Sequence, residues 1–500
     1  MHYISTRGQT EPVVSAQAIK QGIAPDGGLF VPERKVSVDL NQLHKMVGAG
    51  YAEVAEQILS LYLVDYTPEE VAQCVQGAYG EGKFDHRDIA PVYSLNENLH
   101  VLELWHGPTC AFKDMALQIL PHLLTKAAQK TGEKDEIVIL VATSGDTGKA
   151  ALEGFKDVPG TKIIVFFPQE GVSQVQRLQM ITQAGNNVWV VAVQGNFDDA
   201  QSGVKQVFGD LEFNQRLAQR HYKLSSANSI NWGRLVPQVV YYFSSYLKLV
   251  EKKQLAMGEP VNFVVPTGNF GNILAGYYAR QMGLPVKRLI CAANANNVLT
   301  HFIGTGIYDR NREFLKTISP SMDILISSNL ERLLFELTDG DGAQVRKWMG
   351  QLKDTGKYQV DDITKQRVQD IFWSAHASDR DTLETIAEVW HRHNYLVDTH
   401  TAVAFRVYND YKEQTGDTTK TVIASTASPF KFNTSVAEAV LGKEKVIDKS
   451  EFALLDALSK HTGWQIPAGL RNLDQKEILH KKITAKDGIG TAVADILEAD

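Results

Sequence analysis

Lys113 is the residue that the sequence sets apart most clearly for covalent chemistry. It follows small and apolar residues in the segment His106-Gly107-Pro108-Thr109-Cys110-Ala111-Phe112-Lys113-Asp114. Desolvating neighbours can lower the pKa of a lysine, and its neutral amine can then form a Schiff base with a carbonyl compound. Most lysines are solvated surface groups, so this segment alone leaves both interpretations open.

A glycine-bearing loop is a second candidate site. The residues Pro266-Thr267-Gly268-Asn269-Phe270-Gly271-Asn272 follow an apolar stretch at 261–265 and precede a helix expected over 272–282. Two glycines allow a tight turn that presents amide N–H groups, and the helix adds its positive end, so the loop suits a phosphate. A simple tight connection would use the same glycines. The loop matches neither the ATP nor the dinucleotide fingerprint.

A third loop, Thr143-Ser144-Gly145-Asp146-Thr147-Gly148, occupies the same kind of position. Its hydroxyl and amide groups suit a substrate carboxylate at a helix start, whereas helix capping is the plainer interpretation. A phosphate loop, a carboxylate clamp and a nucleophilic lysine are together what pyridoxal phosphate requires to act on an amino acid.

The one histidine-rich cluster invites a metal hypothesis. It contains His391, His393, Asp398 and His400. Their spacing fits no metal-site motif, and a His-x-His pair beside a helix end is more often structural. We therefore expect no metal.

Short apolar strands alternate with amphipathic helices in the middle of the chain. Strands are expected at 137–142, 162–167, 188–193, 261–265, 288–292 and 421–424, and helices between them. This alternation indicates an α/β fold with two open, mainly parallel sheets flanked by helices. Helices expected at 41–61 and 68–78 suggest an amino-terminal helical layer. In such sheets ligands bind beyond the carboxyl ends of the strands, where the three loops lie.

Gradual changes in the pattern of expected helices and strands along the chain suggest three domains. We expect an amino-terminal helical domain at 1–95, a large cofactor-binding domain at 96–134 and 211–500 with a helical insertion at about 301–390, and a smaller mobile α/β domain at 135–210.

Composition excludes several classes of protein. The 500 residues are 44% hydrophobic and 22% charged, which is ordinary for a globular protein. A net charge of −7 without a long basic run argues against nucleic-acid binding. The three cysteines, Cys74, Cys110 and Cys291, are far apart, and no apolar run suits a signal peptide or a membrane span. We expect a cytoplasmic protein that is a monomer or a homodimer.

Ordered motifs along nearly the whole chain carry a family resemblance. The sequence resembles the threonine synthase family of the long type, within the tryptophan-synthase-β-like class of pyridoxal phosphate enzymes. The motifs are those of the three loops, together with Ser5-Thr6-Arg7-Gly8, Pro25-Asp26-Gly27-Gly28, Ser229-Ile230-Asn231-Trp232-Gly233-Arg234, Pro320-Ser321-Met322-Asp323, Ser327-Ser328-Asn329 and Asp398-Thr399-His400-Thr401. Where the family often has His-Pro after Ser425-Thr426-Ala427, this chain has Ser428-Pro429.

The resemblance implies a reaction and a set of roles. The fold would be that of type II pyridoxal phosphate enzymes, and the reaction would convert O-phosphohomoserine and water to threonine and phosphate. Lys113 would hold the cofactor as a Schiff base and then move protons. The cofactor-binding residues would be Lys113, Gly268, Asn269, Phe270, Gly271, Asn272 and Thr426. The substrate-binding residues would be Ser144, Gly145, Asp146, Thr147, Ser226, Asn231, Arg234 and Lys431.

Two other functions remain open at this stage. A related phospho-lyase would release 2-oxobutyrate, ammonia and phosphate from the same scaffold. A protein of another class, a non-catalytic metabolite-binding regulator, would also keep the fold, although the retention of Lys113 argues against it.

Overall fold

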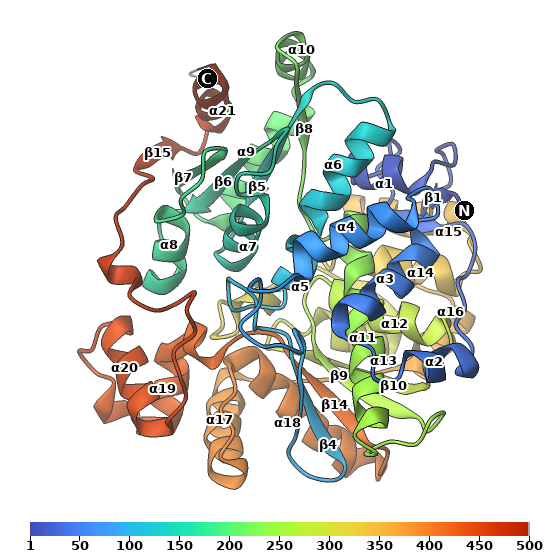
Figure 1. The fold of residues 1–500 in the computed structure, drawn as a ribbon, viewed down its shortest axis with the longest axis vertical. Helices are drawn as coiled ribbons and strands as arrows, with labels where there is room; N and C mark the ends of the chain where they lie inside the picture. The colour runs from blue at the N-terminus through green and yellow to red at the C-terminus, as the bar shows by residue number, and fades with distance from the viewer. Residues whose placement is uncertain (499–500) are drawn as a thin grey trace.

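The computed structural model describes residues 1–498, which form two parallel sheets with helices on both faces and a helical layer at one side (Figure 1). The larger sheet has the strand order β13-β10-β9-β14-β4-β3, and all its pairs are parallel except β3 with β4. Its strands are β3 (Val92–Ser94), β4 (Leu99–Glu103), β9 (Val261–Pro266), β10 (Val286–Ala293), β13 (Phe372–His376) and β14 (Thr421–Ser425).

Both faces of the larger sheet are covered. Phe263 and Val265 of β9 pack with α11 (Trp232–Glu251) and α12 (Gly271–Gln281), whereas Val264 packs with α18 (Thr399–Thr415). Alternate side chains of a strand point to opposite faces, so a strand buried on both faces must be apolar throughout. This is why 261–265 reads as a continuous apolar run.

The smaller sheet is parallel throughout, in the order β15-β7-β6-β5-β8. Its strands are β5 (Glu136–Ala142), β6 (Thr161–Pro168), β7 (Val188–Gln194), β8 (Tyr222–Ser225) and β15 (Lys482–Ala485). The helices around it are α7 (Asp146–Phe155), α8 (Gln174–Ile181), α9 (Phe197–Gly209), α10 (Leu211–Gln219) and α21 (Ile489–Glu498). The predicted fold class, with two mainly parallel sheets between helices, is confirmed.

The amino-terminal layer packs on the larger sheet's helices, with α3 against α11. Its elements are β1 (Tyr3–Ser5), α1 (Ser15–Gln21), β2 (Phe30–Pro32), α2 (Leu40–Met46), α3 (Tyr51–Tyr62) and α4 (Pro68–Tyr79). The single helix expected over 41–61 is wrong. Gly48 has a φ of 86°, which an α-helix does not allow, and α3 starts anew after Gly50.

The segment 301–390 is mainly helical, but it is not only an insertion. It contains β13, which forms an edge of the larger sheet beside β10. Its other elements, with the helix that leads into it, are α13 (Val298–Thr305), β11 (Ile307–Asp309), η1 (Pro320–Met322), α14 (Leu330–Leu337), α15 (Gly342–Thr355), β12 (Lys357–Gln359), α16 (Asp362–Ile371) and α17 (Asp379–His393). β13 includes the polar residues Ser374 and His376, so it is not a continuous apolar run that the sequence would reveal as a buried strand.

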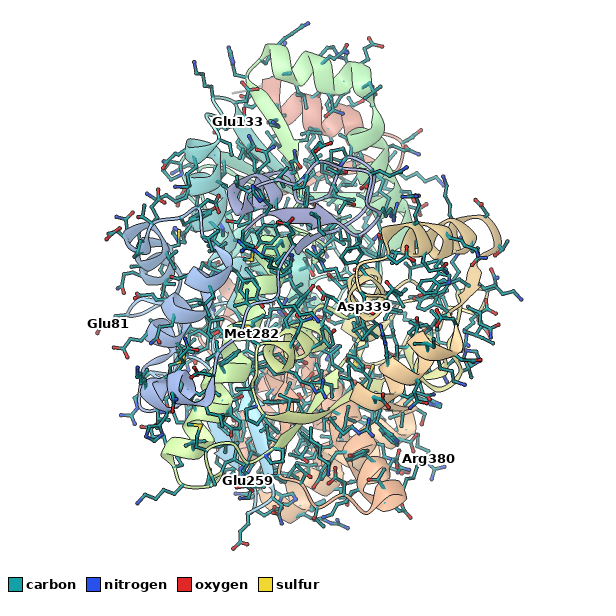
Figure 2. All side chains as sticks on the ribbon, turned by 90° about the vertical axis from the view of Figure 1, so that its right-hand side faces the viewer. Glu81, Glu133, Glu259, Met282, Asp339 and Arg380 are labelled. Carbon is teal, nitrogen blue, oxygen red and sulfur yellow. The ribbon has the colours of Figure 1, made fainter. Side chains whose placement is uncertain are left out.

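The remaining elements connect the two sheets and form the carboxyl-terminal part. They are α5 (Asp114–Leu117), α6 (Leu120–Lys130), η2 (Pro429–Phe432), α19 (Asn433–Leu441), η3 (Lys443–Lys445), α20 (Glu451–Thr462) and η4 (Leu473–Gln475). Figure 2 shows side chains filling the space between the layers, with Glu133 towards the smaller sheet and Glu259 at the opposite end. Among residues 1–498 the longest apolar helices are too short or too polar to cross a bilayer.

The strand pairing divides the chain differently from the expected boundaries. β8 and β15 pair with the smaller sheet, although they lie outside the expected domain at 135–210. In Figure 1 the chain returns at its end to place β15 and α21 beside β7 and α9. We therefore propose that the smaller domain comprises about 135–225 and 482–498.

Candidate active site

Lys113 lies at the start of the short helix α5, on a loop that is tied to the end of β14. Phe112 N donates a hydrogen bond to Thr426 O over 2.8 Å, and Ala111 forms an antiparallel bridge with Ala427. The loop is thereby held at the carboxyl end of the larger sheet, where ligands of open parallel sheets bind. Thr426 and Lys113 are brought to one place by these backbone contacts.

A cavity of about 390 Å³ opens between the two sheets at this point. It is lined from the larger sheet by the loop after β9 and from the smaller sheet by the loop after β5 and by α9. The predicted site residues that line it are Lys113, Ser144, Thr147, Arg234, Gly268, Asn269, Phe270, Gly271, Asn272 and Thr426. Residues more than 300 positions apart in sequence thus share one cavity.

The loop from Gly268 to Asn272 presents its amide groups to this cavity. In the described part of the chain, none of these five N–H groups donates to a protein acceptor. Phe270 is the residue of this turn with a left-handed backbone conformation, at a φ of 65°. Neither Gly268 nor Gly271 has a positive φ, although a tight turn often places a glycine there for that reason. Gly268 is required for a different reason, because a Cβ there would lie 2.9 Å from Ser321 O. The arrangement is an anion-binding nest at the start of α12.

Two buried side-chain nitrogens of this cavity also lack partners. Asn272 Oδ1 accepts hydrogen bonds from the hydroxyls of Tyr241 (2.6 Å) and Tyr242 (2.8 Å), which leaves Asn272 Nδ2 without an acceptor. Arg234 Nε is likewise buried and unpartnered, and burial lowers the pKa of Arg234 to about 10. Buried donors left unsatisfied in a cavity that also contains a free amide nest fit phosphate-bearing ligands, since such groups are costly to bury without a partner.

Lys113 combines burial with a balance of nearby charges. Burial lowers its pKa to about 8; Asp146 opposes this change, and the cations Lys431 and Arg234 add to it. Lys113 Nζ lies 3.9 Å from Asp146 Oδ2, too far for a hydrogen bond. Such an amine is partly neutral near pH 7 and therefore able to act as a nucleophile.

Asp146 and Lys431 form a buried ion pair beside Lys113. Lys431 Nζ lies 3.1 Å from Asp146 Oδ1 and donates to Thr109 O over 2.8 Å. Asp146 also accepts hydrogen bonds from Gln176 Nε2 (2.7 Å) and Ser321 Oγ (2.9 Å). Burial alone would raise the pKa of Asp146, but the two lysines hold it below its usual range. Lys431, expected at the substrate phosphate, pairs with Asp146 and does not line the cavity, and the expected residues Gly145 and Asp146 are absent from the lining too.

The loop after β5 leaves its hydroxyls open to the cavity. Thr143 Oγ1 accepts hydrogen bonds from Gly145 N (3.0 Å) and Gly148 N (2.9 Å), which fixes the turn into α7. Gly145 has a φ of 138°, a conformation in which a side chain would be strained. The hydroxyls of Ser144 and Thr147 form no hydrogen bond with other residues of 1–498 and line the cavity. They lie at the start of a helix, which favours a carboxylate.

Two further expected residues lie away from the cavity. Asn231 caps α11, with its Oδ1 accepting from Gly233 N over 2.8 Å, and Ser226 is absent from the lining. Their neighbours Asn228 and Ser229 line the cavity instead. The sequence identified this segment but not its register, because a loop has no fixed period to show which side chains point inward.

Among the cavity residues that the sequence did not indicate, three carry side chains that bear on ligand binding. Lys205 and Gln201 reach it from α9, with Lys205 Nζ donating to Gln201 Oε1 over 3.2 Å. His400 also lines it, although the sequence placed this residue only in a cluster judged not to bind metal. The i, i+4 spacing of Gln201 and Lys205 on one helix face was an available signal, but it is common on solvated helices.

The hydrogen bonds of His400 define its tautomer. Its Nδ1 lies 2.6 Å from Asp398 Oδ2, and its Nε2 accepts a hydrogen bond from Ser321 N over 3.1 Å. Nδ1 therefore carries the proton, and His400 holds the loop at Ser321 that supports Asp146. His391 and His393 lie apart from this contact, in the last turn of α17. In residues 1–498 no group of His, Cys, Asp or Glu is arranged to hold a metal ion.

Three family descriptions match consecutive parts of the chain. Residues 2–79 match "Threonine synthase N terminus", residues 90–352 match "Pyridoxal-phosphate dependent enzyme", and residues 401–482 match "Threonine synthase, C-terminal". The chain belongs to the threonine synthase family. Its members are pyridoxal phosphate enzymes, and the nest of this cavity, together with Asn272 Nδ2, fits the phosphate group of that cofactor.

Curated relatives agree with the family assignment. Threonine synthase from Pseudomonas aeruginosa is 41% identical over 444 residues, which is 89% of this chain and 91% of that protein. Threonine synthase from Saccharomyces cerevisiae is 37% identical over 92% of this chain and 94% of its own length. Human threonine synthase-like 1 is 38% identical over 97% of this chain, which spans 67% of that longer protein.

Solved structures of threonine synthases share the fold over the whole chain. The pyridoxal phosphate-bound threonine synthase from Brucella melitensis has a TM-score of 0.88 and 37% identity, with 100% of this chain and 99% of that chain covered. The yeast threonine synthase also has a TM-score of 0.88, at 33% identity and the same coverage.

Proposed function

We propose that this chain converts O-phosphohomoserine and water to threonine and phosphate. The observation that supports this reaction best is that one cavity is lined by a lysine of lowered pKa, by an amide nest and by the further cations Arg234 and Lys205. A cofactor phosphate and a substrate phosphate need two separate anion sites. The nest at 268–272 and the Arg234 side of the cavity supply them.

Pyridoxal phosphate, when bound, supplies an electron sink for carbanions formed on the substrate. The chain's own part begins with its binding. The nest and Asn272 Nδ2 would receive the cofactor phosphate, and Lys113 would hold its aldehyde carbon. Thr426, tied to the Lys113 loop through its carbonyl, would offer a hydroxyl to the ring nitrogen, which leaves that nitrogen without an obligatory charge.

Lys113 would be both the anchor and the proton carrier. With a pKa of about 8, about a tenth of such amines are neutral at pH 7, against fewer than one in a thousand for an ordinary lysine. Once the substrate amine replaces it, the freed amine can take the proton from Cα and return protons later in the reaction. Asp146, which opposes the loss of the proton, would keep the ammonium form available as the donor.

The substrate would be held by its two charged ends. Ser144 and Thr147, at the positive start of α7, suit its carboxylate. Arg234 offers an unpartnered buried N–H to its phosphate, and Asn228 and Ser229 add neutral donors. Lys205 of α9 is a further cation that lines the cavity, so we include it among the proposed phosphate-binding residues in place of Ser226, Asn231 and Lys431.

A product assay tests this proposal. Purified holoenzyme given O-phosphohomoserine should release threonine and phosphate in equal amounts, and Lys113→Ala should remove the activity. Lys126→Ala, a lysine of α6 outside the cavity, serves as the matched control. Release of 2-oxobutyrate instead would indicate the phospho-lyase reaction, and absence of any product from cofactor-loaded protein would indicate a regulator.

We also propose a reducing, cytoplasmic location. Cys74, Cys110 and Cys291 are buried free thiols, as is usual for proteins that do not meet an oxidising compartment. We keep the expectation of a monomer or a homodimer, which size-exclusion chromatography with light scattering would resolve.

A further inference from the structure

A second cavity, of about 550 Å³, lies on the far side of the Lys113 loop. Four parts of the chain enclose it: the loop at 82–85, the segment 106–110, the ends of α7 and α8, and the carboxyl-terminal loop at 467–476. It shares no lining residue with the proposed active site. No step of the proposed reaction uses it.

Part of its lining is already neutralised by internal pairs. Lys149 Nζ lies 2.9 Å from Glu153 Oε2. His106 contacts two carboxylates, Asp85 through Nδ1 (2.6 Å) and Glu103 through Nε2 (2.8 Å). These groups account for the acidic residues that line the cavity, Asp85 and Glu153.

Three lysines in the lining remain without partners. In the structure of residues 1–498, the ammonium groups of Lys83, Lys156 and Lys476 form no ion pair and donate no hydrogen bond. Burial lowers the pKa of Lys149, and the charge of Lys476 lowers it further, so the ammonium groups of Lys149 and Lys476 lie near each other. In a protein with a net charge of −7, a cavity with this surplus of positive charge selects anions.

A buried acceptor in the same cavity also lacks a partner. Gln179 is 1% exposed, its Nε2 donates to Gly469 O over 3.2 Å, and its Oε1 accepts no hydrogen bond. An unsatisfied buried acceptor is unfavourable, so a ligand with an N–H or O–H group would be stabilised there. Because of this acceptor, the ligand that fits the cavity best is an anion that also carries an N–H or O–H group.

We propose that this cavity is a second ligand site, which binds a small anion that also carries an O–H or N–H donor. Hydrogen phosphate, phosphate monoesters and carboxylates with a hydroxyl or amino group share this chemistry. Lys83, Lys156 and Lys476 bind the anionic group from three separate segments, and Gln179 Oε1 accepts from the donor.

The position of the site links its occupant to the active site. Asp114, next to Lys113, accepts hydrogen bonds from Thr109 N (2.8 Å) and Thr109 Oγ1 (2.7 Å), within the segment that forms one wall. A Cβ at Gly469 would collide with Pro108 O, so the carboxyl-terminal loop also lies directly against this wall. Lys149 and Glu153 of α7 also line the cavity, and the first turn of this helix carries Asp146 and Thr147. A ligand in the cavity would therefore contact two elements that also contribute to the proposed active site.

Equilibrium dialysis of the holoenzyme against radiolabelled inorganic phosphate tests the proposal. We expect two phosphates per wild-type chain, one per chain for Lys83→Ala/Lys156→Ala/Lys476→Ala, and loss of the other for Arg234→Ala. The three lysines are exposed, so their removal leaves the fold intact, which circular dichroism verifies. Lys443→Ala/Lys445→Ala/Lys460→Ala is the matched control for the change in net charge and should keep both phosphates.

Two results would overturn the proposal. One is a single phosphate per wild-type chain that Arg234→Ala removes, and the other is retention of both phosphates by the variant of Lys83, Lys156 and Lys476. A third result would be one phosphate per wild-type chain that Arg234→Ala keeps and the variant of Lys83, Lys156 and Lys476 loses. This result would count against the proposed active site and support the second site. The two proposals can therefore fail separately.

Discussion

The reactivity of Lys113 depends on how its burial compares with the charges around it. Because burial lowers its pKa to about 8, its neutral, nucleophilic form increases as the pH rises through 8. We expect the rate at which pyridoxal phosphate condenses with the apoprotein to rise between pH 7 and 9 and then level off, whereas an ordinary lysine would still gain reactivity near pH 10.4. Stopped-flow absorbance over this pH range measures the profile. A rate that keeps rising beyond pH 9, as for an ordinary lysine, would contradict this account of Lys113.

The buried ion pair of Asp146 and Lys431 should contribute to the stability of the protein. Replacing Asp146 by Asn leaves Lys431 as an unpaired buried charge, which costs roughly 3–5 kcal/mol of the free energy of unfolding. Replacing both, as Asp146→Asn/Lys431→Met, should recover most of that loss, because no buried charge remains unpaired. Urea unfolding of the two variants and the wild type measures this difference. Equal stability of the single variant and the wild type would show that the pair is solvated.

At the scale of elements, the two glycines of the loop between β9 and α12 differ in how much room they leave for a side chain. In Gly268→Ala the new Cβ would press on the backbone of Ser321 and Met322, at 2.9 and 3.1 Å. Overpacking of this size costs about 1–3 kcal/mol, so cofactor affinity should fall about tenfold or more. Gly271→Ala is the control, because its Cβ would make only ordinary contacts with side-chain atoms, of which the nearest is Asn329 Nδ2 at 3.4 Å. Fluorescence titration of the apoproteins would contradict the assignment if both variants bound equally.

The elements also show what the sequence could predict. Buried strands such as 137–142 and 421–424 are continuous apolar runs, so their positions and the loops after them were predictable within two residues. Side chains in irregular segments were not. Lys431 pairs with Asp146, and Asn228 lines the cavity. No periodic pattern around either residue reveals the direction of its side chain. Likewise β15 joins the smaller sheet from the far end of the chain, and no local signal indicates a partner 290 positions away.

At the scale of the whole molecule, the stability of the protein should depend on pH through His106. Burial disfavours its charged form, but the hydrogen bonds to Asp85 and Glu103 prevail and raise its pKa to about 9. A raised pKa means that the stabilisation is complete below the unfolded value of about 6.5 and is lost as the pH rises towards 9. The stability difference between the wild type and His106→Gln should therefore shrink by up to about 3 kcal/mol between pH 6 and 9.5. A difference independent of pH, measured by urea unfolding, would show that His106 does not titrate.

The central claim is that one lysine of the interface between the two sheets carries the cofactor. Borohydride reduction of the holoenzyme, followed by peptide mapping, tests it most directly because it records both the cofactor and its attachment site. We expect one pyridoxyl group per chain, on Lys113 alone. A label on Lys149, Lys205 or Lys431, or no label after loading with pyridoxal phosphate, would contradict the account.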